Sequence, residues 1–75
     1  MRQRFPVNIE INLSDEFGGK VFAEQSERGK YTVMQKDEFI ASGVPYATLE
    51  KIMDNAATDP QRAQGNLAIL AYRGM

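Results

Sequence analysis

The chain has 75 residues, with 9 Lys and Arg against 10 Asp and Glu, and it contains no Cys, His or Trp. Because a domain this small buries only about 60% of the surface that its unfolded chain exposes, we expect one domain over residues 1–75 with a thin core. The lack of Cys and His excludes disulfides, thiolate nucleophiles and the commonest zinc ligands, so neither a metal site nor a cofactor is expected.

The first half of the chain predicts three strands. Between residues 7 and 13 apolar side chains alternate with polar ones, which is the period of a strand with one wet face. Residues 14–19 form a polar turn with two glycines, and residues 20–25 are predicted as the returning strand, with Phe22 on the side opposite Val21 and Ala23. A second polar turn at 26–30 leads to a third strand at 31–34. These residues therefore predict a three-stranded meander.

The second half changes to helical spacing. Residues 36–42 predict a short helix ended by Gly43, and residues 45–57 predict an amphipathic helix that begins at Pro45. Asp59 and Pro60 resemble a helix cap followed by a first-turn proline, so one helical turn is expected at 61–64, ended by Gly65. Residues 66–72 are apolar on both faces, which predicts a buried strand, although a short buried helix fits the same pattern.

These elements predict an α+β fold of order β-β-β-α-α-β, with two helices on one face of a small antiparallel sheet. No Gly-rich phosphate loop, calcium-binding loop or serine elbow occurs in the sequence. Two adjacent acidic pairs, Asp15-Glu16 and Asp37-Glu38, are typical of a solvated turn and of a helix N-terminus. We therefore expect a binding protein and not an enzyme.

Residues 35–52 resemble the helix-turn-helix of phage repressors and excisionases. The matching residues are Gln35, Gly43, Val44, Thr48, Leu49 and Ile52. Phe39 stands where a small residue is usual, and Glu38 occupies a normally apolar position. The would-be recognition helix carries Glu50 and Asp54 with only Lys51 as a cation, which suits phosphates poorly. A small DNA-binding regulator stays the alternative hypothesis, and so does an ordinary helical corner without DNA-binding function.

A second resemblance extends over residues 9–72. The segments that carry this resemblance follow one another in the same order and at nearly the same spacing as in the family. They are Glu16-Phe17-Gly18-Gly19, the acidic pair Asp37-Glu38, Val44-Pro45 followed by Ala47, and Ala56-Ala57. In this order they resemble one of the small phage anti-CRISPR families that inhibit type I-F surveillance complexes.

That resemblance implies an inhibitor that occupies the DNA-binding surface of the complex, on the large subunit that reads the short motif beside the target. Surface carboxylates would imitate phosphates and pair with Lys and Arg of that subunit. The candidate partner-binding residues are Asp15, Glu16, Asp37, Glu38 and Glu50.

The sequence departs from this family at one acidic pair. Where the family has a further acidic pair, this chain has Thr32 and Val33, so the mimicry of DNA phosphates would depend on local clustering of the remaining carboxylates.

No apolar run reaches the roughly 18 residues of a membrane span. We therefore expect a protein of the host cell cytoplasm that contacts neither membranes nor, directly, nucleic acid.

Overall fold

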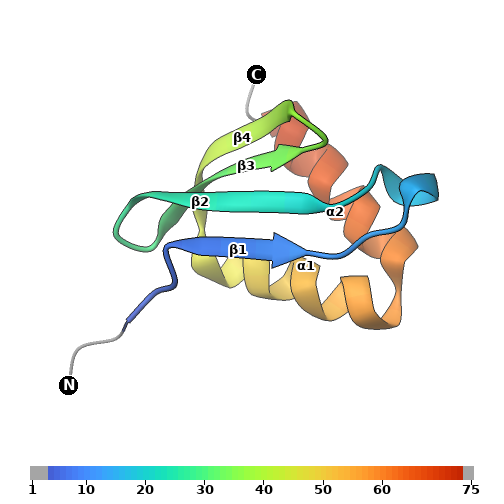
Figure 1. The fold of residues 1–75 in the computed structure, drawn as a ribbon, viewed down its shortest axis with the longest axis horizontal. Coiled ribbons are helices and arrows are strands. Elements are labelled where there is room, and N and C mark those ends of the chain that lie inside the picture. Colours follow the sequence, from blue (N-terminus) through green and yellow to red (C-terminus); the bar gives the residue numbers. More distant parts are fainter. Residues whose placement is uncertain (1–3, 74–75) are drawn as a thin grey trace.

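A computed structural model describes residues 4–73 and contains four strands followed by two helices (Figure 1). The elements are β1 (Asn8–Ile11), a short 3-10 helix η1 (Asp15–Phe17), β2 (Val21–Glu27), β3 (Lys30–Gln35), β4 (Glu38–Pro45), α1 (Tyr46–Thr58) and α2 (Pro60–Arg73). The predicted α+β class, with an antiparallel sheet and two helices, is confirmed. The predicted order is wrong, because all four strands precede the helices.

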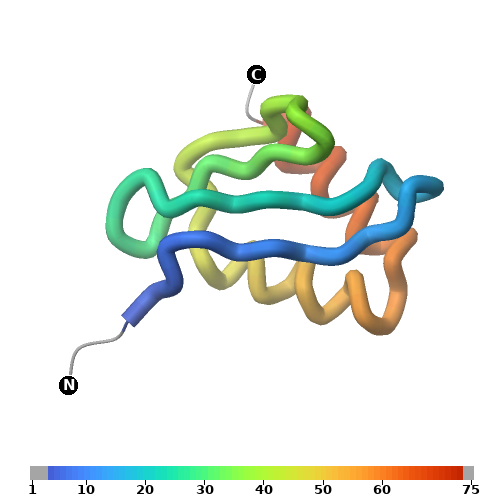
Figure 2. The backbone as a smooth tube through the Cα atoms, in the orientation of Figure 1, coloured from blue at the N-terminus to red at the C-terminus, as the bar shows by residue number. Residues whose placement is uncertain are grey.

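The sheet is an antiparallel meander in which each strand pairs with the next along the chain, as the backbone path in Figure 2 shows. In its first strand the expected alternation holds, because Ile9 and Ile11 are buried and Glu10 between them is exposed. Val7 is the exception. It precedes β1 and is 61% exposed, so it does not belong to the core.

The helix predicted over residues 36–42 is a turn and a strand. Lys36 and Asp37 have φ angles of 49° and 64°, as a two-residue type I′ hairpin requires, and β4 starts directly after them. The register between β3 and β4 shifts twice. Gly43, at a φ of 67°, lies opposite the shift between Tyr31 and Val33. These bulges break the period of two along β4, which is why its apolar residues resemble a helical pattern.

The strand predicted over residues 66–72 is part of α2, which runs through Gly65 without a break. Asp59 precedes this helix as predicted, and its Oδ1 accepts a hydrogen bond from the Arg62 backbone N–H at 3.4 Å. Leu67 is buried, whereas Ile69 is 54% exposed, so α2 keeps apolar side chains on its wet side. That feature produced the two-sided apolar pattern. No helix within residues 4–73 combines the length and apolar character needed to cross a bilayer.

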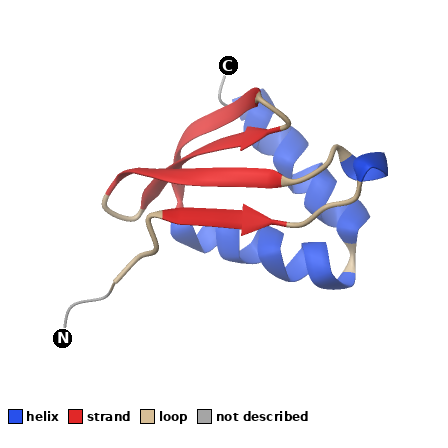
Figure 3. Ribbon diagram, in the orientation of Figure 1, coloured by secondary structure: helices blue, strands red, loops and turns tan. Residues whose placement is uncertain are grey.

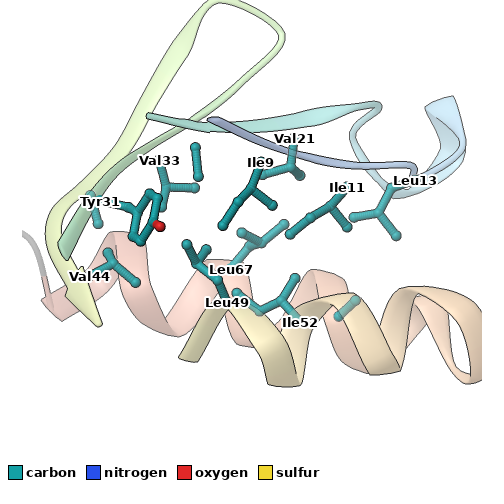
Figure 4. Close-up of a cluster of buried hydrophobic side chains, with 13 residues drawn as sticks. Ile9, Ile11, Leu13, Val21, Tyr31, Val33, Val44, Leu49, Ile52 and Leu67 are labelled. Atoms are coloured by element: carbon teal, nitrogen blue, oxygen red, sulfur yellow. The ribbon is translucent and has the colours of Figure 1, made fainter. Parts of the chain in front are cut away.

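Both helices cover the same face of the sheet, which gives two layers with the core between them (Figure 3). Figure 4 shows the side chains of the sheet and those of the helices meeting in this layer. The buried apolar residues are Ile9, Ile11, Leu13, Val21, Ala23, Tyr31, Val33, Ala41, Val44, Leu49, Ile52, Ala63 and Leu67. The opposite face of the sheet carries no helix, and its side chains face outward.

Candidate functional site

Two loops that are distant in the sequence meet at one end of the sheet. The loop containing η1 leads into β2 at Val21, and Val21 pairs with Gln35, the last residue of β3 before the β3–β4 turn. The Gln35 side-chain Nε2 donates hydrogen bonds to the carbonyl oxygens of Phe17, at 3.2 Å, and Gly19, at 2.9 Å. One amide side chain therefore fastens the first loop to the second.

The two glycines of the first loop are required by this close approach. Gly18 and Gly19 have backbone φ angles of 99° and 90°, which residues other than glycine rarely adopt. A Cβ atom at Gly18 would overlap the Gln35 amide, and one at Gly19 would overlap the Lys36 side chain. The Phe-Gly-Gly segment thus has a structural role in bringing the η1 loop onto the β3–β4 turn.

This arrangement gathers four of the five predicted partner-binding carboxylates. Asp15 and Glu16 lie in η1, Asp37 lies in the β3–β4 turn and Glu38 begins β4; all four are exposed. We call this group the acidic end: Asp15, Glu16, Asp37 and Glu38. Since the two acidic pairs come from different loops, their proximity depends on the tertiary fold.

The acidic end also contains one ion pair. The Lys36 Nζ lies 3.3 Å from the Asp15 Oδ1, with both side chains more than half exposed. A pair this exposed contributes little to stability, typically less than about 1 kcal/mol. Its main effect is to neutralise Asp15. In the described part of the chain, Glu16, Asp37 and Glu38 form no ion pair, so their charges remain available to a cationic partner.

Glu50, the fifth predicted partner-binding residue, lies elsewhere. It is exposed on α1, close to the end where α1 follows β4. There the backbone N–H of Tyr46 donates to the Gly29 carbonyl oxygen, 3.1 Å away in the β2–β3 turn, which is the opposite end of the sheet from η1. The structure therefore separates Glu50 from the acidic end by much of the length of β4.

The helix-turn-helix predicted over residues 35–52 does not form. Residues 38–45 are a strand of the sheet, and Val44, expected in the turn between two helices, is buried opposite Tyr31. Only the second expected helix exists, as α1. The sequence arrangement that suggested a DNA-reading helix pair therefore reflects a strand that leads straight into a helix.

The uncovered face of the sheet carries a group of exposed apolar side chains for which the sequence predicts no function. Phe22, Met34 and Phe39 are 46%, 39% and 59% exposed, and they lie on β2, β3 and β4. The signal was present at Phe22, which stands on the wet side of the predicted second strand. Phe39 gives no such signal, because the sequence predicts a helix over residues 36–42.

Neither region has the geometry of a metal centre. Within residues 4–73, no group of three or more Asp, Glu, His or Cys side chains is placed to hold a metal ion. A small hollow of about 170 Å³ lies between α1 and α2 and is lined by Lys51 and Arg73 among others.

Comparisons with models of known protein families, with curated proteins and with solved structures found no match.

Proposed function

We propose that this protein is an anti-CRISPR-like inhibitor that binds a type I-F surveillance complex in the host cell cytoplasm and competes with target DNA. The contact surface is the acidic end, and the partner is the large subunit that reads the short motif beside the target. The carboxylates take the places of DNA phosphates and pair with Lys and Arg side chains of that subunit.

One observation supports this function above the others: the η1 loop and the β3–β4 turn bring two acidic pairs to a single exposed end of the sheet. Their loops are joined by the hydrogen bonds of Gln35 and by the ion pair of Lys36 with Asp15. The chain as a whole carries a net charge of only −1. Recognition of a cationic surface therefore has to come from local clustering, which the acidic end supplies.

The experiment is a competition titration followed by fluorescence anisotropy of a labelled target duplex bound to a type I-F surveillance complex. The wild-type protein is expected to release the duplex. The variant Glu16→Gln/Asp37→Asn/Glu38→Gln keeps the side-chain shapes and removes three charges, and it should weaken the competition at least about tenfold, as loss of close charge pairs does. Asn at position 37 tolerates the positive φ angle of the turn.

The matched control removes three carboxylates outside the acidic end. Glu27→Gln/Glu50→Gln/Asp54→Asn has the same net charge as the test variant, and all three positions are exposed. It should compete within about threefold of the wild type, since long-range charge alone has a small effect at physiological salt. Equal losses in both variants, or no duplex release by the wild type, would contradict the proposal. A salt-sensitive anisotropy increase with protein and duplex alone would instead indicate direct DNA binding.

A further inference from the structure

The uncovered face of the sheet presents a continuous row of apolar side chains. Phe22 on β2 pairs with Met34 on β3, and Met34 pairs with Phe39 on β4, so the three stand side by side across three strands. Glu10 on β1 pairs with Phe22 and continues the row at one end. We call Phe22, Met34 and Phe39 the apolar stripe. Exposed large apolar side chains that form a contiguous row on a sheet are typical of an interaction surface.

The sheet is hollowed beside this stripe. A groove of about 940 Å³ lies over β1, β2 and β3, and Glu10, Phe22, Glu24 and Met34 are among its lining residues. The groove is open to solvent, as expected over the twisted face of a short sheet. An elongated partner therefore fits it better than a small enclosed ligand does.

The charges around the groove select a cationic partner. Glu10 stands at one end of the stripe, and Glu24 lies in the next row of the same face, between Asn8 and Thr32. One cation, Lys20, lies over the Phe22 ring, with its Nζ 5.8 Å from the ring centroid, and the two carboxylates outnumber it. Two carboxylates would repel the phosphates of a nucleic acid strand whose bases stacked on Phe22 and Phe39. Lys and Arg side chains of a protein partner would be attracted instead.

The dimensions of the stripe suit a helix. Neighbouring strands lie about 4.8 Å apart, close to the pitch of an α-helix at about 5.4 Å, so a helix lying across the strands places one apolar residue over each side chain of the stripe.

We propose that the apolar stripe docks one amphipathic helix of a partner protein, about three turns long. Its apolar residues, at positions i, i+4 and i+7, contact Phe22, Met34 and Phe39 in turn, and Lys or Arg residues on its flanks face Glu10 and Glu24. The stripe borders the acidic end, since Phe39 follows Glu38 in β4, but this proposal does not depend on the proposed inhibition of a surveillance complex.

The test uses a phage-displayed library of random peptides of about 14 residues, long enough for the proposed helix. Selection on the wild-type protein should enrich peptides with apolar residues at the helical spacing and with Lys or Arg beside them. A selected peptide, synthesised with a fluorescent label, should become helical by circular dichroism when it binds. The double variant Phe22→Thr/Phe39→Thr keeps strand-favouring residues and should lose at least about tenfold in affinity.

Two controls separate the stripe from general effects. Ile69→Ala removes another exposed apolar side chain, on α2, and should leave the peptide affinity within about twofold, as expected away from the interface. Glu10→Lys/Glu24→Lys should weaken binding of the basic peptide and strengthen binding of a matched peptide in which every Lys and Arg is replaced by Glu, because the charge complementarity is reversed. Such a charge exchange would not result from a loss of folding.

Several outcomes would overturn the helix-docking proposal. They are a selection without enrichment, a selection that enriches acidic peptides, and a selected peptide that still binds Phe22→Thr/Phe39→Thr at wild-type affinity. If the wild-type protein sediments as a dimer and Phe22→Thr/Phe39→Thr sediments as a monomer, the occupant of the stripe is a second copy of this chain. Binding of a labelled single-stranded oligonucleotide that this variant abolishes would assign the stripe to nucleic acid.

Discussion

Tyr31 is the largest fully buried side chain, and its hydroxyl group is the polar atom that the core has to accommodate. The hydroxyl donates a hydrogen bond to the Pro6 carbonyl oxygen, and the ring stacks at a tilt against Tyr46, with centroids 6.0 Å apart. Burial raises the pKa of Tyr31 above its ordinary value of 10.0, and the neighbouring Tyr46 phenol adds to the increase. The native state therefore holds the neutral phenol, which ties the segment before β1 to the core.

Stability should accordingly fall at alkaline pH. Because the folded pKa of Tyr31 is the higher one, its contribution is complete below about pH 10, where the unfolded phenol titrates, and is lost as pH rises through the folded pKa. Tyr31→Phe should lower the free energy of unfolding by about 1 kcal/mol at neutral pH, since one hydrogen bond is lost. The difference from wild type should shrink as the solution is made more alkaline.

Urea unfolding at a series of pH values from neutral to above 10 measures this difference. Tyr72→Phe is the control, because Tyr72 is 81% exposed and its replacement should change neither the stability nor its pH dependence. A difference between wild type and Tyr31→Phe that stays constant across the series would show that ionisation of Tyr31 does not contribute.

At the scale of elements, α2 continues through a glycine that the sequence suggested as its end. A Cβ atom at Gly65 would meet no other atom within 4 Å, and α2 extends from Pro60 to Arg73 on both sides of it. Gly65→Ala should therefore raise the free energy of unfolding by about 0.5–1 kcal/mol, through higher helix propensity and a less flexible unfolded chain.

Gly43→Ala is the matched comparison for this change. Gly43 also has no atom within 4 Å of a built Cβ, but its φ of 67° strains any other side chain, so the same substitution should destabilise by about 1 kcal/mol. Chemical denaturation of both variants gives the two signs. Destabilisation by Gly65→Ala as well would indicate that residues 66–72 are not helical in solution.

The sequence predicts elements well where a single periodicity is undisturbed. The alternation from Ile9 to Leu13 and the helical spacing of Leu49 and Ile52 both match the structure. The sequence does not predict the β3–β4 hairpin, because Lys36 and Asp37 adopt positive φ angles without a glycine and because bulges disturb β4. Over residues 66–72 the local sequence does not distinguish a strand from a helix. Tertiary packing decides that only the side of α2 that carries Leu67 is buried.

The site shows the same division. Each acidic pair was visible as adjacent carboxylates, but their meeting at one end depends on the pairing of Val21 with Gln35 and on the hydrogen bonds of the Gln35 side chain. Residue type alone groups Glu50 with these carboxylates, and only the path of β4 in the fold separates Glu50 from the acidic end. The apolar stripe needed the register of three strands, because Phe22 and Phe39 become neighbours of Met34 only in the folded sheet.

For the whole molecule, one layer of side chains joins the sheet to the helices. Leu49 is fully buried in this layer, on the helix that follows the sheet directly. Leu49→Ala should lower the free energy of unfolding by about 2–5 kcal/mol. A domain of this length has a total of roughly 4–11 kcal/mol, so the change removes a large part of its stability.

Thermal unfolding of Leu49→Ala, followed by far-UV circular dichroism for the helices and near-UV circular dichroism for the packed tyrosines, should shift both signals together. Ile69→Ala is the control; because this side chain is half exposed on α2, it should change stability by less than about 0.5 kcal/mol. Helix loss at a lower temperature than tyrosine unpacking would show that the sheet and the helices are separate cooperative units.

The order of strands and helices along the chain has a consequence for synthesis on the ribosome. All four strands leave the exit tunnel before α1 and α2, so the sheet emerges with nothing to cover Ile9, Ile11, Val21 and Val33. The core closes only after Leu67 on α2 has also left the tunnel, so the sheet waits for both helices. A stop codon near Pro45 would release the four strands without either helix, and this fragment would expose its apolar face and aggregate in place of forming a smaller domain.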